Sequence, residues 1–257
     1  MRTRPDVEIA NLTDLGVQRD HNEDYFLYIE PEDDEEFASK GRLLLVADGM
    51  GGHNGGEVAS SIAAAALRQA FLDAESEEPR TVLLRGFSQA QREILARGSA
   101  AGDLSGMGTT CTAVILRNGE LSFGHIGDSR LYLLRDGVIS QLSEDHTLVH
   151  QLVKGGALSK EEAETFERKN VLTAALGMRS EEVAADFSEA PVILQPGDTL
   201  IVSSDGLHGM IHDDEIAETA GTMNPDGACH ALVKLAIERG GPDNITVQIL
   251  RVVAVKR

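Results

Sequence analysis

The sequence predicts an α+β fold in which helices pack on the outside of central antiparallel sheets. Two observations support this prediction. Short apolar segments typical of strands follow one another across the tight-turn pairs Asn118-Gly119 and Asp136-Gly137, which indicates antiparallel hairpins. Segments with helical apolar spacing come in pairs between groups of such strands, as expected when helices cover the sheets.

Strands are expected where apolar residues alternate with polar ones, or form a short run bounded by Gly, Asn or Asp. In chain order they are residues 7–13, 23–29, 42–48, 109–117, 120–126, 130–135, 198–204 and 244–253. Helices are expected where the apolar spacing changes to the helical period behind a capping-type residue, a glycine or a proline. In chain order they are residues 56–73, 79–97, 146–154, 159–167, 213–220 and 226–239.

The chain has 257 residues, with 23 Lys+Arg against 42 Asp+Glu and a formal charge of −19. A chain of this length can bury a full hydrophobic core, and no internal repeat or Pro/Gly/Ser-rich linker divides it. We therefore expect one domain over residues 1–257. Six carboxylates fall within residues 30–36, which we expect to form a solvated surface loop without a chemical role.

Charge and cysteine content exclude several classes of function. The strong acidity argues against a nucleic-acid binder, since such affinity comes mostly from Lys and Arg on phosphates. No stretch approaches the roughly 20 apolar residues needed to span a bilayer, so no membrane association is expected. Cys111 and Cys229 show neither a disulfide framework nor zinc-site spacing, and we expect both to be buried in a cytoplasmic, monomeric protein.

Aspartates at the ends of apolar strands are the informative feature. Asp48 ends LLLVAD, Asp128 follows HIG, Asp205 ends LIVSSD and Asp243 precedes NITVQIL. Any one of them alone would be read as a turn or cap residue. Several carboxylates converging at sheet ends would repel one another unless cations neutralise them. Oxygen ligands without Cys/His clusters indicate Mg²⁺ or Mn²⁺.

The segments that carry these aspartates occur in an order that resembles one family. They are GVQRDHNED (16–24), VADGMGGH (46–53), MGTT (107–110), HIGDSRLY (125–132), EDHTLV (144–149), LTAALG (172–177), PGDTLIVSSDGL (196–207) and GGPDNITV (240–247). On these motifs, which run from one end of the chain to the other, it resembles the bacterial metal-dependent protein phosphatases of the PPM/PP2C family.

This resemblance implies a four-layer αββα sandwich, with two antiparallel sheets flanked by helices and a two-metal site at one end. It would make Asp48 the carboxylate that bridges both Mn²⁺ or Mg²⁺ ions, and would place the Gly49 carbonyl on one of them. The remaining metal-site roles that it implies are ligation of the other ion by Asp205 and Asp243, support of metal-bound waters by Glu23 and Asp24, and a third, weaker ion on Asp128 and Asp205.

The implied reaction is hydrolysis of phosphoserine or phosphothreonine by direct attack of a water or hydroxide that bridges the two ions. Asp48 would be catalytic through those ions, and Arg19 would clamp the phosphate, because a guanidinium offers two parallel donors to phosphate oxygens. His53 matches the position of the general acid that protonates the leaving alkoxide. His146 is interpreted as structural or supporting, and His125 as packed.

Departures from the family pattern lie in the flap region, near residues 155–176. Phe166-Glu167 stand where many bacterial members have His-Pro, and Ala174 stands where they have Arg. These changes affect substrate contact rather than metal binding, and Arg168 or Lys169 can compensate for the lost charge.

Three functions remain open on the sequence. The leading one is a protein Ser/Thr phosphatase whose partners are phosphoproteins made by a Ser/Thr kinase. The others are a metal phosphatase for small phosphate esters, phosphohistidine or phosphotyrosine, and a non-catalytic binding relative. Retention of the whole carboxylate set weighs against the last of these.

Overall fold

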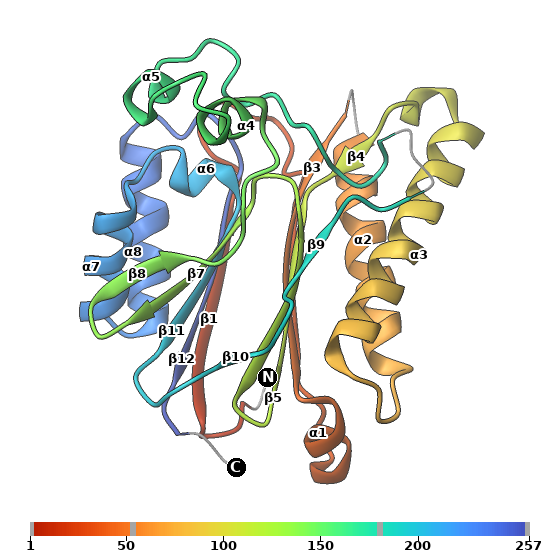
Figure 1. The fold of residues 1–257 in the computed structure, drawn as a ribbon, viewed down its shortest axis with the longest axis vertical. Coiled ribbons are helices and arrows are strands. Elements are labelled where there is room, and N and C mark those ends of the chain that lie inside the picture. The colour runs from red at the N-terminus through yellow and green to blue at the C-terminus, as the bar shows by residue number, and fades with distance from the viewer. Residues whose placement is uncertain (1–2, 52–54, 179–181, 255–257) are drawn as a thin grey trace.

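The computed structural model describes residues 3–51, 55–178 and 182–254. In these residues, two antiparallel sheets stack face to face, and helices cover the outer face of each sheet (Figure 1). The four-layer α+β sandwich predicted from the sequence is therefore confirmed. The N-terminal and C-terminal strands are neighbours in one sheet, although they are the most distant strands along the chain.

The first sheet has the strand order β1-β12-β11-β7-β8. Its strands are β1 (Val7–Asp14), β7 (Arg130–Arg135), β8 (Val138–Gln141), β11 (Thr199–Ser203) and β12 (Ile245–Val252). The second sheet has the order β10-β6-β5-β3-β2, with β4 paired to β3 and β9 paired to β6. Its strands are β2 (Asp24–Ile29), β3 (Arg42–Met50), β4 (Gly108–Thr109), β5 (Cys111–Arg117), β6 (Glu120–Ile126), β9 (Asp186–Phe187) and β10 (Val192–Ile193).

The helices divide between the two outer faces and the two ends of the sandwich (Figure 1). The described helices are α1 (Asp34–Lys40), α2 (Gly55–Leu72), α3 (Pro79–Ala100), α4 (Leu148–Lys154), α5 (Lys160–Glu164), α6 (Asp205–His208), α7 (Asp213–Thr222) and α8 (Pro225–Glu238). Helices α2 and α3 cover the second sheet, and α7 and α8 cover the first. None of the helices in the described residues has the length and apolar character needed to cross a membrane.

Strand β3 shows why the sequence contains a continuous apolar run at this point. Leu44 and Val46 pack between the two sheets, whereas Leu43 and Leu45 pack against α2 and α3. Both faces of the strand are therefore buried, so apolar residues are favoured at every position rather than at alternate ones. The end of this strand carries Asp48 out of the core at one end of the sandwich.

The main strands and helices agree with the sequence predictions, including the two hairpin turns. Asn118 and Asp136 both have a φ of 53°, which Asn and Asp tolerate better than most residues. The sequence analysis missed the short elements α1, α6, β8, β9 and β10. Elements this short offer too few residues for a period to be recognised, and they form because tertiary contacts hold them.

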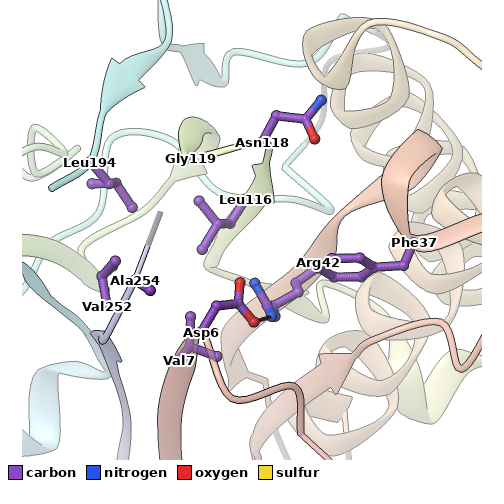
Figure 2. Close-up of a pocket in the computed structure, with 10 residues that line it drawn as sticks. All are labelled: Asp6, Val7, Phe37, Arg42, Leu116, Asn118, Gly119, Leu194, Val252 and Ala254. Carbon is purple, nitrogen blue, oxygen red and sulfur yellow. Dashed lines mark hydrogen bonds and ion pairs between the residues drawn. The ribbon is translucent and has the colours of Figure 1, made fainter. Parts of the chain in front are cut away.

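The expected solvated loop at residues 30–36 is wrong in two respects. Asp33 caps helix α1, accepting hydrogen bonds from the backbone of the first turn. The Glu30 side chain is only 2% exposed and receives Nε of Arg42 at 2.6 Å. Arg42 also contacts Asp6 and lies 4.7 Å from the ring centroid of Phe37, around a small cavity of about 50 Å³ (Figure 2). A buried arginine therefore recruits part of the acidic run into the core.

Candidate metal centre

Asp48 and Asp24 lie directly opposite each other in the β2–β3 register. Strand β3 extends beyond the core here, and a loop from β4 fixes its backbone. The backbone N–H of Asp48 donates to Oγ1 of Thr110 at 3.0 Å, and its carbonyl accepts from Oγ1 of Thr109 at 2.9 Å. The MGTT segment therefore positions Asp48 from the neighbouring chain.

Gly49 is required by a close approach between backbones. A Cβ at this position would lie 2.1 Å from the carbonyl oxygen of Gly56 at the start of α2. A Cβ on Gly56 would in turn lie 2.5 Å from Oε1 of Glu23. Two glycines thus allow the strand end, the helix start and the Glu23 carboxylate to meet at one point.

Ser204 connects the two sheets at this end. Its Oγ donates to Oδ2 of Asp24 at 2.7 Å and accepts from the backbone N–H of Thr246 at 3.0 Å. Asp205 follows immediately and begins α6, so the turn that leaves β11 places its carboxyl beside Asp24 from the other sheet. Gly206 is needed because a Cβ there would meet the Asn244 carbonyl at 2.0 Å.

Arg19 lies in the loop between β1 and β2, which Asn244 holds against β12. Nδ2 of Asn244 donates to the carbonyls of Leu15 and His21, and its Oδ1 accepts from the backbone N–H of Glu23. Nη2 of Arg19 then reaches Oδ2 of Asp243 at 2.6 Å. Asn244 therefore ties the loop carrying Arg19 to the strand that follows Asp243.

Asp128 occupies the turn between β6 and β7. The preceding Gly127 has a φ of 105°, a conformation that favours glycine, and packs on Thr110. Oγ of the following Ser129 lies 2.7 Å from Oγ1 of Thr110, the same threonine that holds Asp48. One threonine thus links the turns carrying two of the aspartates.

The pKa values of these carboxyls are raised because burial and mutual repulsion both disfavour the charged form. Burial is the largest cause for Asp48, whose pKa lies well above its ordinary value, and the charges of Asp24 and Asp205 add to it. Burial raises the pKa of Asp24 to about 7, against a hydrogen bond from Ser204 that lowers it. Burial and the charge of Asp205 raise the pKa of Asp128 to about 8.

Buried oxygens without a hydrogen-bond partner mark the same place. Among the described residues these atoms are Oε1 of Glu23, Oδ1 of Asp24 and Oδ1 of Asp205. An unpaired buried carboxylate oxygen is costly, and a divalent cation would satisfy it. An all-oxygen donor set suits Mg²⁺ or Mn²⁺. The residues present therefore fit the metal ions that the sequence implies.

The carboxylates do not form a closed cage. Within the residues that the structure describes, no three His, Cys, Asp or Glu side chains make a ready-made metal-binding cluster. Ser204 and Arg19 already engage Asp24 and Asp243. An open set is consistent with Mg²⁺-type sites, which keep several waters and use few carboxylates, in contrast to a structural zinc cage.

The histidines differ in their placement. His53 lies outside the described residues. His125 is fully buried, with Nδ1 2.9 Å from Oγ1 of Thr112, and burial lowers its pKa to about 4, in agreement with its interpretation as packed. Nδ1 of His146 accepts from the backbone N–H of Gly127 at 3.2 Å, which supports the turn before Asp128.

A groove of about 830 Å³ opens at this end of the molecule. Asp128, Asp205 and Asp243 line one part of it, and further lining comes from the flap, including Lys169, and from residues 209–214 between α6 and α7. Figure 1 shows α4 and α5 of the flap over the end of the sandwich where α6 begins.

The flap residues that depart from the family pattern have different surroundings. Ala174 is half-buried and packs against the hydrophobic cluster that includes α2 and α3. Phe166 and Glu167 lie in the segment after α5, with Glu167 exposed. Of the two residues expected to compensate for the lost charge, Lys169 lines the groove.

The sequence analysis assigned no role to Ser204, Thr110 or Asn244, which hold the site together by hydrogen bonds. Each lies inside one of the family motifs and next to, or paired with, an assigned aspartate. A Ser, Thr or Asn beside a strand-end aspartate was the available signal, because such side chains can hold neighbouring backbone in place.

Comparison with known proteins agrees with this geometry. A family model described as Protein phosphatase 2C matches residues 20–235. The serine/threonine phosphatase stp of Listeria monocytogenes is 37% identical over 243 residues, covering 93% of both chains. PstP of Mycobacterium tuberculosis is 38% identical over 95% of this chain and 45% of its own length.

Solved structures give the same answer. The S. agalactiae serine/threonine phosphatase superposes with a TM-score of 0.86 at 36% identity, covering 96% of this chain and 99% of its own. The catalytic domain of PstP in complex with two manganese ions superposes with a TM-score of 0.81 at 35% identity, covering 96% and 99%. With sequence, fold and site geometry in agreement, this chain belongs to the protein phosphatase 2C family.

Proposed function

We propose that this protein is a metal-dependent protein serine/threonine phosphatase. The observation that carries the proposal is the convergence of strand-end carboxylates from both sheets, with unpartnered buried oxygens on Glu23, Asp24 and Asp205, beside the guanidinium of Arg19. Relatives named serine/threonine phosphatases cover nearly the whole chain, which supports a phosphoprotein substrate.

The chain's own residues divide the work. Asp48, the Gly49 carbonyl, Asp205 and Asp243 would hold two Mn²⁺ ions, while Glu23 and Asp24 would support them from behind. When bound, two ions about 3.5–4 Å apart activate a water for in-line attack and neutralise phosphoryl oxygens.

Arg19 binds the phosphate in this proposal. Asp243 holds its Nη2, which leaves the other N–H groups of the guanidinium as donors to phosphate oxygens. His53 donates a proton to the leaving serine or threonine oxygen, a role that rests on its motif position alone.

The same residues support finer features of this function. Mg²⁺ could replace Mn²⁺, since both prefer oxygen ligands. A third ion would bind Asp128 and Asp205, which the raised pKa of Asp128 supports. We further propose that residues 1–257 act as one domain and as a cytoplasmic monomer, and that the substrates are products of a Ser/Thr kinase.

The test compares phosphoserine and phosphothreonine peptides with small phosphate esters, with EDTA or Mn²⁺ present. Manganese-dependent release of phosphate from the peptides is expected. Turnover of small esters alone would make the protein a small-molecule phosphatase. A folded protein that binds phosphopeptides without turnover in Mn²⁺ would be a binding module.

A further inference from the structure

The groove beside the metal centre has two walls of different charge. Lys169 lies on the flap wall, formed by residues 149–170, and Asp213 and Asp214 lie on the α7 wall, formed by residues 209–214. Asp205 lines the same groove, and its buried Oδ1 has no partner, which already indicates a ligand at this end. A protein substrate whose phosphate reaches Asp205 must place neighbouring residues along these walls.

Other charged groups at the groove are neutralised by their partners. Arg130 grips Asp145 with two donors, Nε to Oδ1 at 3.0 Å and Nη2 to Oδ2 at 2.7 Å. Behind the α7 wall, Glu215 is paired with Nη2 of Arg239 at 2.6 Å. These pairs therefore contribute little net charge to a ligand in the groove.

Asp213 and Asp214 keep their charge available. Both residues are exposed, and the Asp213 side chain is 47% exposed. Oδ1 of Asp213 accepts from the hydroxyl of Tyr132 at 3.0 Å and lies 3.8 Å from Nη1 of Arg130. Oδ1 of Asp214 accepts only a backbone N–H, from Glu215, among the contacts of the described residues. The hydroxyl contact fixes the direction of Asp213 without neutralising it.

Lys169 on the flap wall is the opposite case. It is exposed and, within the described residues, takes part in no ion pair. The groove therefore presents a fixed pair of negative charges on a helix and one positive charge in the flap.

We propose that Asp213 and Asp214 form a subsite that selects a basic residue close to the phosphorylated serine or threonine of a protein substrate. The inference rests on the proposed phosphatase function and names the class of peptide that this site prefers. A Lys or Arg beside the α7 wall meets two carboxylates a short distance away, whereas a Glu or Asp is repelled by them.

A helix-capping role for these acids, or an effect of overall charge, would each produce different behaviour. First-turn acids stabilise a helix through its dipole, which would affect stability but not peptide choice. The overall charge of −19 would favour basic peptides whichever surface carboxylates are removed. Screening over about 8 Å at physiological ionic strength makes nearby carboxylates more important than distant ones.

The experiment compares two variants with the same change in net charge. Asp213→Asn with Asp214→Asn neutralises the subsite. Asp34→Asn with Glu35→Gln neutralises two exposed first-turn acids of α1, at the opposite end of the molecule. kcat/KM is measured at low salt for one phosphothreonine peptide with Lys or Glu placed at each flanking position in turn.

Wild type should prefer the best Lys-flanked peptide over its Glu counterpart by about three- to tenfold at low salt, and the preference should shrink as salt is added. The subsite variant should lose most of this ratio, and the α1 variant should keep it. Equal ratios in both variants, or no preference in wild type, would overturn the subsite.

Lys169→Gln gives a second measurement with the opposite sign. Removing the flap charge should raise the preference for Lys-flanked peptides, whereas Lys234→Gln on the exposed face of α8 should leave it unchanged. Manganese-dependent hydrolysis of an aryl phosphate is followed in every variant. If that activity is present in wild type but the peptide ratios do not respond, the subsite is wrong while the phosphatase function stands.

Discussion

Nη2 of Arg19 lies 2.6 Å from Oδ2 of Asp243, across 224 positions of sequence. The proposed phosphate clamp and a proposed metal ligand are therefore in direct contact. Oδ1 of Asp243 meanwhile accepts from the backbone N–H of Asn244, so the carboxylate that orients Arg19 is itself fixed. Phosphate binding and metal binding should consequently respond to each other's mutations.

Arg19→Ala should lower kcat/KM for phosphopeptides by about 10- to 100-fold, because a charge-assisted hydrogen bond contributes about 1.5–3 kcal/mol. Arg19→Lys should recover little, since an ammonium cannot contact Asp243 and phosphate with parallel donors. Steady-state kinetics on one phosphopeptide would measure both. Arg68→Ala, on the exposed face of α2, is the matched control. Full rescue by lysine would show that only charge is needed at this position.

Asp48→Asn and Asp243→Asn should each reduce manganese-dependent turnover more than about 100-fold, since losing several kcal/mol of metal-mediated stabilisation costs this much. Their effects on folding should differ. Asp48→Asn should raise the melting temperature in EDTA, because burial and neighbouring carboxylates oppose its charge. Asp243→Asn should not, because it also breaks the contact with Arg19. Calorimetric melting with EDTA would separate them, and near-normal activity in either variant would refute the assigned coordination.

The sequence predicts the layers and the strand-end aspartates because both depend on local pattern. The apolar run ending at Asp48 and the hairpin turns at Asn118 and Asp136 are readable from neighbouring residues alone. That Asp24 and Asp205 come together from different sheets is not local. It required the order of motifs along the whole chain.

The missed features depend on contacts between distant segments. Glu30 looks like part of a solvated acidic run, yet Arg42, twelve positions later, draws it into the core. Ser204 connects Asp24 to Thr246 across 180 positions in one direction and 42 in the other. Composition and period contain no information on such pairs, because the partners are chosen by the packing of the two sheets.

Asp128→Asn should leave the two-ion core occupied and weaken only a third ion, with a moderate loss of turnover. It should also change how stability depends on pH without metal. The folded-state pKa of Asp128 is about 8, above the value near 3.9 of an unfolded chain, so its contribution is lost as pH rises between them. The variant's advantage in EDTA should therefore grow from pH 4 to pH 8. Titration calorimetry with Mn²⁺ and melting curves would test both parts, and loss of the tight sites would contradict this division of roles.

His125 should make the protein sensitive to mild acid. Burial lowers its pKa to about 4, while an unfolded histidine titrates near 6.5, so stability is lost as pH falls through this window. The loss should approach about 1.4 kcal/mol per pH unit. His125→Gln should be less stable than wild type at pH 7 but lose less between pH 6.5 and 4. Urea unfolding across this range would show the difference, and parallel curves for the two proteins would exclude His125 as the cause.

His53→Ala should slow hydrolysis of phosphoserine peptides far more than hydrolysis of an aryl phosphate. An alkoxide leaves poorly without a proton, whereas a phenolate needs none, so only the peptide reaction requires a general acid. General acid catalysis contributes about 10²- to 10⁴-fold, which sets the expected size of the difference. His53→Asn serves as a second variant that keeps a polar side chain but cannot supply the proton near neutral pH. kcat on both substrates at saturating Mn²⁺ gives the ratio directly. Equal losses on the two substrates would mean that His53 positions other groups, because a positioning defect slows the reaction whatever group departs.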